Sequence, residues 1–169
     1  FIGCSALVGG AISVYDKSNL VMNTGAVSNC SAQFGGAITV SFSNRFEVND
    51  FTFSDNNATK EGAIRILMSP STFNNCTFEG NKGEICSVMF FCSKITTMNN
   101  VFKDNIGVMG GAMKVTQSSF WHSVNDSFYG CHSRAGNGGG VHIDGNSNAT
   151  IKNSLFIKCH SLKEGGAVY

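Results

Sequence analysis

The chain has little charge and almost no proline. Of its 169 residues only 14% are charged, the formal net charge is +1, and Pro70 is the single proline. A balance this close to neutral gives no reason to expect nucleic acid or an anionic membrane as a partner. So few charges also disfavour a helical globule, because the exposed faces of helices are rich in charged and polar residues.

Long apolar runs and helical spacing are missing too. No apolar stretch approaches the roughly 20 residues of a membrane-spanning helix, so we expect no membrane span in this segment. No segment of about ten residues repeats its apolar positions at helical spacing. Gly, Ser, Thr and Asn are abundant instead, which is typical of short strands joined by tight turns.

What the chain does have is a repeated glycine motif. Gly-Gly-Ala followed by an aliphatic residue recurs at steps of 26, 26, 49, 28 and 27 residues. The step of 49 is close to two periods, with a worn copy near Cys86-Ser87-Val88. A fixed period of this size predicts a solenoid. The copies are Gly9-Gly10-Ala11-Ile12, Gly35-Gly36-Ala37-Ile38, Glu61-Gly62-Ala63-Ile64, Gly110-Gly111-Ala112-Met113, Gly138-Gly139-Gly140-Val141 and Gly165-Gly166-Ala167-Val168.

A second motif, Phe-x-x-Asn or Phe-x-x-Cys, runs in phase with the first. Its copies step by 26, 26, 25, 24, 26 and 28 residues, and each precedes its glycine pair by about 8 to 10 residues. Two markers that agree over seven turns make the repeat a strong signal. The copies begin at Phe1, Val27, Phe53, Phe78, Phe102, Phe128 and Phe156.

Around these motifs the sequence predicts strands. After each glycine pair, apolar and polar residues alternate, which is typical of a half-buried strand. The strand before each Phe-x-x-Asn contains an Asn or Asp that suggests a bend, at Asp50, Asn75, Asn99, Asp126 and Asn153. The outward residues after the glycines are expected to be Ser13, Thr39, Arg65, Phe90, Lys114, His142 and Tyr169.

Two or three short strands per period predict an all-β, right-handed, single-stranded parallel β-helix. We expect about seven coils of 24–28 residues and one segment spanning residues 1–169. Stacking at about 4.8 Å per coil would make a rod roughly 30 Å long. A sandwich of hairpins is the alternative interpretation of the period.

Each repeated residue type then has an expected role. The glycines Gly9, Gly10, Gly35, Gly36, Gly62, Gly110, Gly111, Gly139, Gly165 and Gly166 would form corners, where positive φ and close backbone approach are needed. The Asn of Phe-x-x-Asn would tolerate the left-handed region, and its stacked copies would hydrogen-bond along the rod. The Phe column would stack inside the coil.

The paired motifs GGA[I/L/V] and FxxN resemble the polymorphic outer membrane protein repeat, known from chlamydial autotransporter passengers and from surface proteins of some protists. The resemblance covers the whole chain and implies a β-helical, surface-exposed, adhesive or structural segment of a longer protein. Cysteine stands at four of the family's Asn positions. Together with the sequons described below, this favours a secreted or ectodomain segment of a eukaryotic protein.

The cysteines fall partly into columns. Cys4 and Cys30 share one position in adjacent coils, as do Cys131 and Cys159. Stacked neighbours about 4.8 Å apart at Cα are within disulfide range, so we predict a bridge in each pair, with stacked free thiols as the alternative. The other three, Cys76, Cys86 and Cys92, have no evident partner, and seven is an odd number.

Cysteine density and five Asn-x-Ser/Thr sequons point outside the cytosol. The candidate glycosylation sites are Asn29, Asn57, Asn75, Asn125 and Asn148. Chance sequons in an Asn-rich chain are the alternative. The repeat is already under way at the first residue, so we expect an internal fragment of a longer repeat protein. At both ends we expect further coils or copies of the same protein.

Metal and aromatic sites are less favoured. Two cysteine–histidine doublets could suggest zinc, at Cys131-His132-Ser133 and Cys159-His160-Ser161. Neighbouring side chains on an extended chain point to opposite sides, so cysteine and histidine cannot converge on one ion. We therefore predict an exposed histidine ladder and no metal or other cofactor. Phe90-Phe91 and Phe120-Trp121 are either a contact patch or pairs with only one ring in the core.

Catalysis is the last question. Pectate lyases and polygalacturonases share this fold and need clustered acids. Here Asp55 and Asp104 share a column, but Gly80 lies between them. The stretch Gly139–Gly145 shows no acid trio beside a catalytic cation. We therefore predict a non-enzymatic extracellular scaffold, structural or adhesive, with glycans or cell-surface proteins as candidate partners. The alternative is a polysaccharide-binding or polysaccharide-cleaving fragment.

Overall fold

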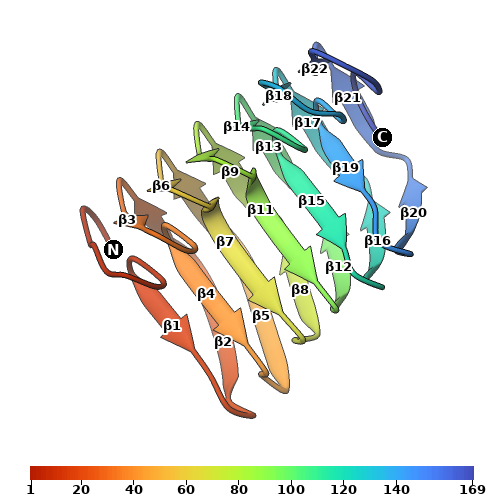
Figure 1. The fold of residues 1–169 in the computed structure, drawn as a ribbon. Coiled ribbons are helices and arrows are strands. Elements are labelled where there is room, and N and C mark those ends of the chain that lie inside the picture. The colour runs from red at the N-terminus through yellow and green to blue at the C-terminus, as the bar shows by residue number, and fades with distance from the viewer.

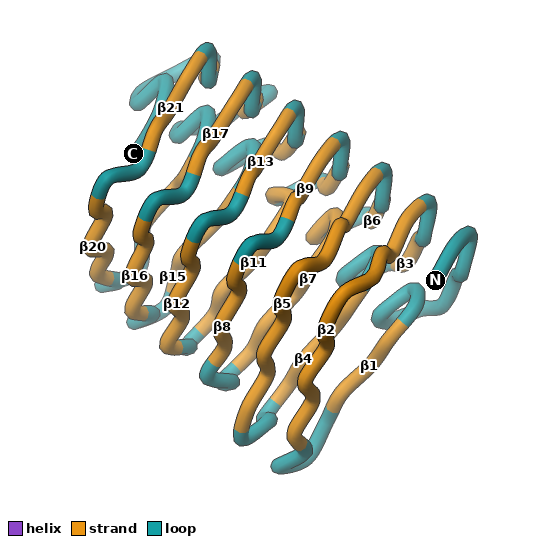
Figure 2. The backbone as a smooth tube through the Cα atoms, turned by 180° about the vertical axis from the view of Figure 1, so that it is seen from behind, coloured by secondary structure: helices purple, strands orange, loops and turns teal.

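The computed structural model describes all 169 residues as strands and turns, without a helix (Figures 1 and 2). The chain winds through coils stacked along one axis, and all strand pairings are parallel. The predicted parallel solenoid is confirmed and the hairpin sandwich is wrong. It has about six turns instead of seven, because the Phe1 and Phe156 copies lie in incomplete coils. No helix long and apolar enough to cross a membrane is present.

Each coil contributes to three sheets. The glycine-corner sheet follows the Gly-Gly motif, and the short sheet precedes it. The glycine-corner sheet contains β1 (Ile12–Val14), β4 (Ile38–Ser41), β7 (Glu61–Leu67), β11 (Cys86–Phe91), β15 (Met113–Thr116) and β19 (Val141–Ile143). The short sheet contains β3 (Ser31–Ala32), β6 (Asn57–Ala58), β10 (Lys82–Gly83), β14 (Ile106–Gly107), β18 (His132–Ser133) and β22 (His160–Ser161).

The long sheet bends in the middle. A left-handed residue at the bend breaks most coils into two strands, whereas β2 and β5 run through it. The first half contains β2 (Asn19–Ser28), β5 (Arg45–Ser54), β8 (Ser71–Asn74), β12 (Lys94–Met98), β16 (Phe120–Val124) and β20 (Asn148–Lys152). The second half adds β9 (Thr77–Glu79), β13 (Val101–Lys103), β17 (Ser127–Tyr129) and β21 (Leu155–Ile157).

The two glycines of each corner have different structural roles. The first glycine of a pair has a positive φ, +60° at Gly35, which L-residues rarely adopt. The second touches the next coil, since a Cβ on Gly36 would lie 2.3 Å from the carbonyl oxygen of Gly62. The remaining corners repeat one or both features: Gly9, Gly10, Gly62, Gly110, Gly111, Gly138, Gly139 and Gly165. At Gly166 the nearest atom would be 3.6 Å away.

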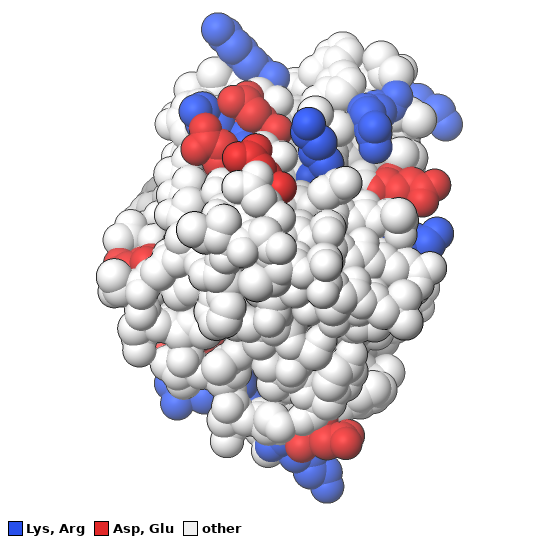
Figure 3. Space-filling model, turned by 90° about the vertical axis from the view of Figure 1, so that its left-hand side faces the viewer, with Lys and Arg blue, Asp and Glu red and all other residues white.

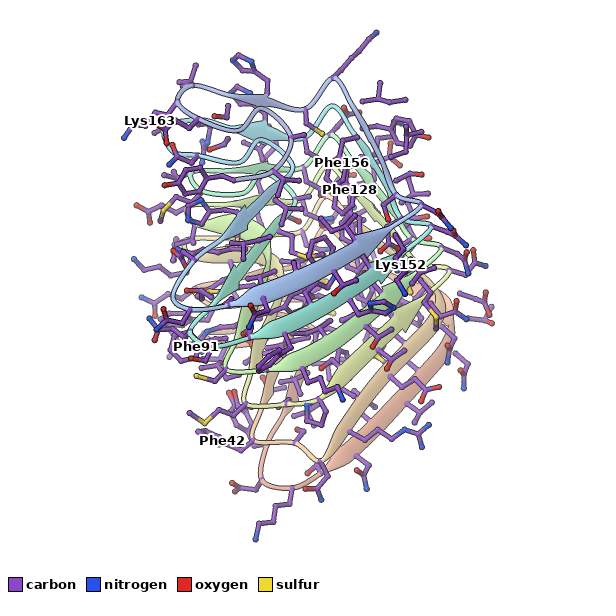
Figure 4. All side chains as sticks on the ribbon, turned by 90° about the vertical axis from the view of Figure 1, so that its right-hand side faces the viewer. Phe42, Phe91, Phe128, Lys152, Phe156 and Lys163 are labelled. Carbon is purple, nitrogen blue, oxygen red and sulfur yellow. The ribbon has the colours of Figure 1, made fainter.

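Phenylalanine rings fill the interior as a continuous stack. Centroid spacings fall from 5.0 Å between Phe53 and Phe78 to 4.4 Å between Phe128 and Phe156. The rings of Phe102 and Phe128 are tilted by only 4°. Figure 4 shows Phe128 and Phe156 inside the coil. The predicted Phe column is confirmed, and each stacked pair contributes about 0.5–1.5 kcal/mol beyond area burial.

Buried asparagines form a ladder beside this stack. Asn56 donates from both its backbone N and its Nδ2 to Oδ1 of Asn81, and each bond is 3.0 Å long. Asn81 makes the same two bonds to Asn105. The amide ladder is confirmed, but the expected left-handed conformation of these asparagines is wrong. The preceding residue adopts it, with φ of +53° at Asp55 and +64° at Gly80, which turns each amide inward.

Two further polar ladders line the other corners. In one, Cys76 N donates to Asn100 Oδ1 at 2.8 Å, and Asn100 N donates to Asp126 Oδ1 at 2.9 Å. Asp126 is therefore inside the coil, and the bend residue is Asn125 (φ +55°), which corrects the bend predicted at Asp126. In the third ladder each backbone N–H donates to the next serine hydroxyl, through Ser43, Ser69, Ser93, Ser119 and Ser147.

The worn coil shifts the register of one strand. Pairing slips between Cys86 and Val88, because this corner has one residue fewer than its neighbours. Met89 consequently pairs with Arg65 and Lys114. Phe90 is only 1% exposed and lies in the core, so its predicted outward position is wrong.

Candidate functional site

The cysteine columns form as predicted, but all seven cysteines are free thiols. Cys4 N donates to Cys30 Sγ at 3.3 Å, and Cys131 and Cys159 stack in the same way between the last coils. In-register parallel neighbours hold their Cβ atoms about 4.8 Å apart, beyond the roughly 3.8 Å of a typical disulfide. The geometry therefore favours stacked thiols, and a bridge requires a small backbone shift.

The thiols differ in their ionisation. A hydrogen bond from the Cys131 thiol lowers the pKa of Cys159 to about 7, and the same bond together with burial raises that of Cys131. Burial raises the pKa of Cys76 to about 11. It also holds the pKa of Cys86 well above its ordinary value. Cys159, half-buried, is thus the thiol most disposed to react.

The five candidate glycosylation asparagines all lie on the surface. Asn29, Asn57, Asn75, Asn125 and Asn148 are each exposed. His132 and His160 also point outward, with their rings stacked 5.1 Å apart, while Cys131 points inward. No group of three or more His, Cys, Asp or Glu that could hold a metal ion is present.

The structure brings together one charged cluster that the sequence did not indicate. Lys114 Nζ and His142 Nε2 both lie 3.1 Å from Asp144 Oδ2. Burial alone would raise the pKa of Asp144, but hydrogen bonds from Thr116 and Lys114 hold it below its ordinary value. The cluster is covered: the side chain of Lys114 is 10% exposed and that of His142 is 6% exposed. The sequence around His142 predicts only generic β-helix, because it shows no acid trio beside a catalytic cation.

The accessible candidate site is a shallow groove on the first half of the long sheet. Two hollows of about 220 and 150 Å³ adjoin there and share Lys94 and Thr96 in their linings. They cross β5, β8, β12, β16 and β20, which follow one another in Figure 2 from β5 near the centre to β20 at the left. From β5 to β20 the groove runs along the rod axis for roughly 19 Å, four coil steps.

Strand register sets the side chains of this groove in two outward columns. In the first, Lys94, Phe120 and Asn148 occupy one position in successive coils. The second column is rich in hydroxyl groups and contains Glu47, Thr72, Thr96, His122 and Thr150. Alternation along β16 explains the aromatic pair, since Trp121 is 2% exposed and Phe120 is 56% exposed.

Charge in the groove is sparse. Arg45 pairs with Glu47, which also accepts a hydrogen bond from Asn49 at 3.2 Å. The bonds from Asn49 and Arg45 lower the pKa of the Glu47 carboxyl. Lys94 makes no ion pair and is the free cation of the groove. Figure 3, which views the N-terminal end of the rod, shows an uncharged centre with charged side chains around its margin.

Comparison with known proteins identifies the fold family. The family model described as a right-handed β-helix region matches residues 3–156. A search of curated proteins and a search of solved structures found no match. The match spans nearly all the coils described above and fixes the hand of the solenoid, so the chain belongs to the right-handed β-helix family.

Proposed function

We propose that the chain is a non-enzymatic, extracellular β-helical scaffold that adheres to glycans through the groove on its long sheet. The observation that carries this proposal is the groove itself, with the exposed ring of Phe120 set among hydroxyl-bearing side chains on a stiff support. Sugars present hydroxyl groups and apolar C–H faces, which such a surface complements. The resemblance to adhesive polymorphic outer membrane protein repeats supports the same function.

The rigidity of the rod supports a scaffold. Polar ladders satisfy the backbone at three corners, and stacked rings fill the interior. Groups held on such rigid elements stay in place, which lowers the entropic cost of binding. The outward columns of the groove can therefore act as a preformed surface.

Exposed sequons support an extracellular location. Expression of the chain with a secretory leader in a eukaryotic host, followed by glycopeptide mapping, tests this part. We expect glycan at several of Asn29, Asn57, Asn75, Asn125 and Asn148. Complete absence of glycan on the secreted chain would count against it.

Adhesion is tested on a glycan array. The purified chain should bind a restricted set of glycans, and the Phe120→Ala variant should lose that binding. Phe42→Ala is the matched control, because Phe42 is also exposed (54%) but is not among the residues that line the groove. An array without any bound glycan would leave a purely structural rod and refute the adhesive part.

Polysaccharide cleavage is a second candidate function, favoured by the Lys114–Asp144–His142 cluster. A carboxylate within 3.1 Å of an amine and an imidazole could support proton transfer if a substrate reached it. Product release from pectin-like polymers, abolished in Asp144→Asn, would establish this function. Lack of turnover by the wild-type chain would exclude it for those polymers.

A further inference from the structure

We propose that Lys114 and Asp144 join in an intramolecular isopeptide bond, an amide between the two side chains, with His142 as the proton carrier. The bond links β15 to the residue directly after β19 and so fastens two adjacent coils covalently at the glycine-corner sheet. It is independent of glycan binding. It gives the charged cluster a role different from polysaccharide cleavage, because a carboxyl group held in an amide is no longer free.

Backbone pairing holds the reacting groups together. Lys114 and His142 are register partners on β15 and β19, which lie side by side in Figure 1. Asp144 follows His142 by two residues, so both side chains leave the strand on the same face. The backbone N of Asp144 also donates to the carbonyl oxygen of Val115 at 3.0 Å. Groups fixed in this way react as though at a very high local concentration.

The two oxygens of the Asp144 carboxylate have different surroundings. Lys114 Nζ and His142 Nε2 each lie 3.1 Å from Oδ2. Oδ1 is buried and has no hydrogen-bond partner. An unpartnered oxygen is costly to bury when it carries charge, and less so in a neutral amide. This asymmetry suits Oδ2 as the oxygen that leaves and Oδ1 as the carbonyl oxygen that stays.

Burial of the amine favours condensation over a permanent ion pair. The side chains of Lys114 and His142 are both buried, Met109 Sδ lies 3.8 Å from Nζ, and the ring of Tyr169 stacks on His142 at 5.0 Å. Separated charges are penalised in such surroundings. A neutral amine and acid hold the same protons as the ion pair, so a fraction of this reactive form exists wherever the ion pair does. The Asp144 side chain is 36% exposed, which gives the released water a way out.

The reaction needs no oxidant or other co-reactant. After a proton moves from Nζ to the carboxyl group, the neutral Nζ of Lys114 attacks Cγ of Asp144. The Nζ–Cγ bond forms, the Cγ–Oδ2 bond breaks, and Oδ2 leaves as water with two of the three ammonium protons. Because an ionised Oδ2 only accepts, His142 carries its proton on Nε2. It gives that proton to the leaving oxygen and takes one from Nζ in return.

A second ion pair in the chain serves as an internal control. Lys103 Nζ lies 2.6 Å from Glu79 Oε1, closer than the reacting pair, but the two side chains are 49% and 43% exposed. Water stabilises both charges there, so this pair should not condense. We therefore expect loss of a single water from the whole chain.

Mass spectrometry of the intact, reduced chain, made without glycosylation, tests the proposal. The mass should lie about 18 Da below that of the sequence, which is the loss of one water. Trypsin should then release residues 104–134 joined to residues 135–152 through Lys114 and Asp144. A wild-type chain at its full sequence mass would overturn the proposal, as would a link between Lys103 and Glu79 in its place.

A succinimide at Asp144-Gly145 has the same mass and must be distinguished from the bond. It joins no second peptide and does not involve Lys114. In Lys114→Arg the mass loss should vanish, because the guanidinium group stays protonated and does not attack. It should vanish in Asp144→Ala as well. Water loss that persists in Lys114→Arg would overturn the bond. Fluorescence of the buried Trp121 confirms that each variant is folded.

The rate of bond formation tests the part played by His142. The chain is made by cell-free translation, and samples are quenched in acid at intervals and weighed. His142→Gln should form the bond about 100-fold more slowly than the wild type, the scale of a lost proton carrier. His132→Gln is the matched control, because His132 lies on the short sheet, and its rate should be unchanged. Equal rates for His142→Gln and the wild type would overturn this role.

Discussion

Asn56 donates from Nδ2 to Oδ1 of Asn81 at 3.0 Å, across the boundary between two coils. The same Oδ1 accepts the backbone N–H of Asn56, and Asn81 Nδ2 donates to the carbonyl oxygen of Phe53 at 2.9 Å. One side chain therefore satisfies three buried groups of the preceding coil. Buried polar networks of this type, when every member is hydrogen-bonded, rigidify the core.

Replacement of Asn81 by Ala should destabilise the chain markedly. It leaves the backbone N–H of Asn56 and the carbonyl of Phe53 without this partner, whereas Asn56 Nδ2 keeps its bond to the carbonyl oxygen of Val27. Each buried unsatisfied group costs about 1–3 kcal/mol. The measurement is the denaturation midpoint in urea. Asn19→Ala, at an exposed position, is the control and should change it little. Equal stability of the two variants would contradict the ladder.

Gly111→Ala should destabilise the corner, whereas Gly166→Ala should not. A Cβ at Gly111 would lie 2.4 Å from the carbonyl oxygen of Gly139, but at Gly166 the nearest atom is 3.6 Å away. The overpacked variant should lose about 1–3 kcal/mol. Thermal unfolding followed by circular dichroism compares the two, and similar melting temperatures would show that close approach does not matter.

Glu61→Gln should stabilise the chain at pH values above the ordinary pKa of a glutamate carboxyl group. Burial raises the pKa of Glu61 above its ordinary 4.5, against the opposing effect of Arg65 at 3.6 Å, and Oε2 has no hydrogen-bond partner. The folded chain therefore holds this proton more tightly than the unfolded chain. Stability falls as pH rises from 4.5 through the raised pKa.

The glutamine variant lacks this fall, so its advantage over the wild type should grow across that pH range and then level off. Urea denaturation at a series of pH values measures it. Glu84→Gln serves as the control, because Glu84 is exposed. An advantage independent of pH would contradict the assignment to Glu61.

Cys159 should be alkylated readily near neutral pH. The hydrogen bond from Cys131 lowers the pKa of Cys159 to about 7, so about half of the Cys159 side chains are thiolate at pH 7. Removing the donor in Cys131→Ala should slow iodoacetamide labelling at pH 7 by roughly tenfold. Mass spectrometry of the labelled peptides follows the rates, with the exposed Cys92 as an internal reference. An unchanged rate would show that Cys131 does not activate its neighbour.

Sequence reasoning succeeded where one residue type repeats at one position. The Phe stack and the glycine corners follow directly from period and steric demand. The serine ladder shares this period, from Ser43 to Ser147, but serine is so common here that the column is easily overlooked.

The errors have local physical causes. A corner shortened by one residue moved Phe90 inward, because a slip of one residue in a strand reverses its face. The groove could not be predicted, since its two columns mix charged, aromatic and hydroxyl residues without any repeated type. Only the register of the folded strands brings Lys94 beside Phe120.

The ladders also define how such a protein can change its length. In the asparagine and serine ladders each backbone N–H donates to the same residue type at the same position one coil later, so these adjacent coils meet through identical donors and acceptors. Deletion of one whole period would place Asn56 beside Asn105, so that the same bonds could form. Deletion of half a period would leave the donors of Asn56 without an acceptor. Evolution can thus lengthen or shorten the molecule by duplicating or deleting complete coils, without redesigning the junctions.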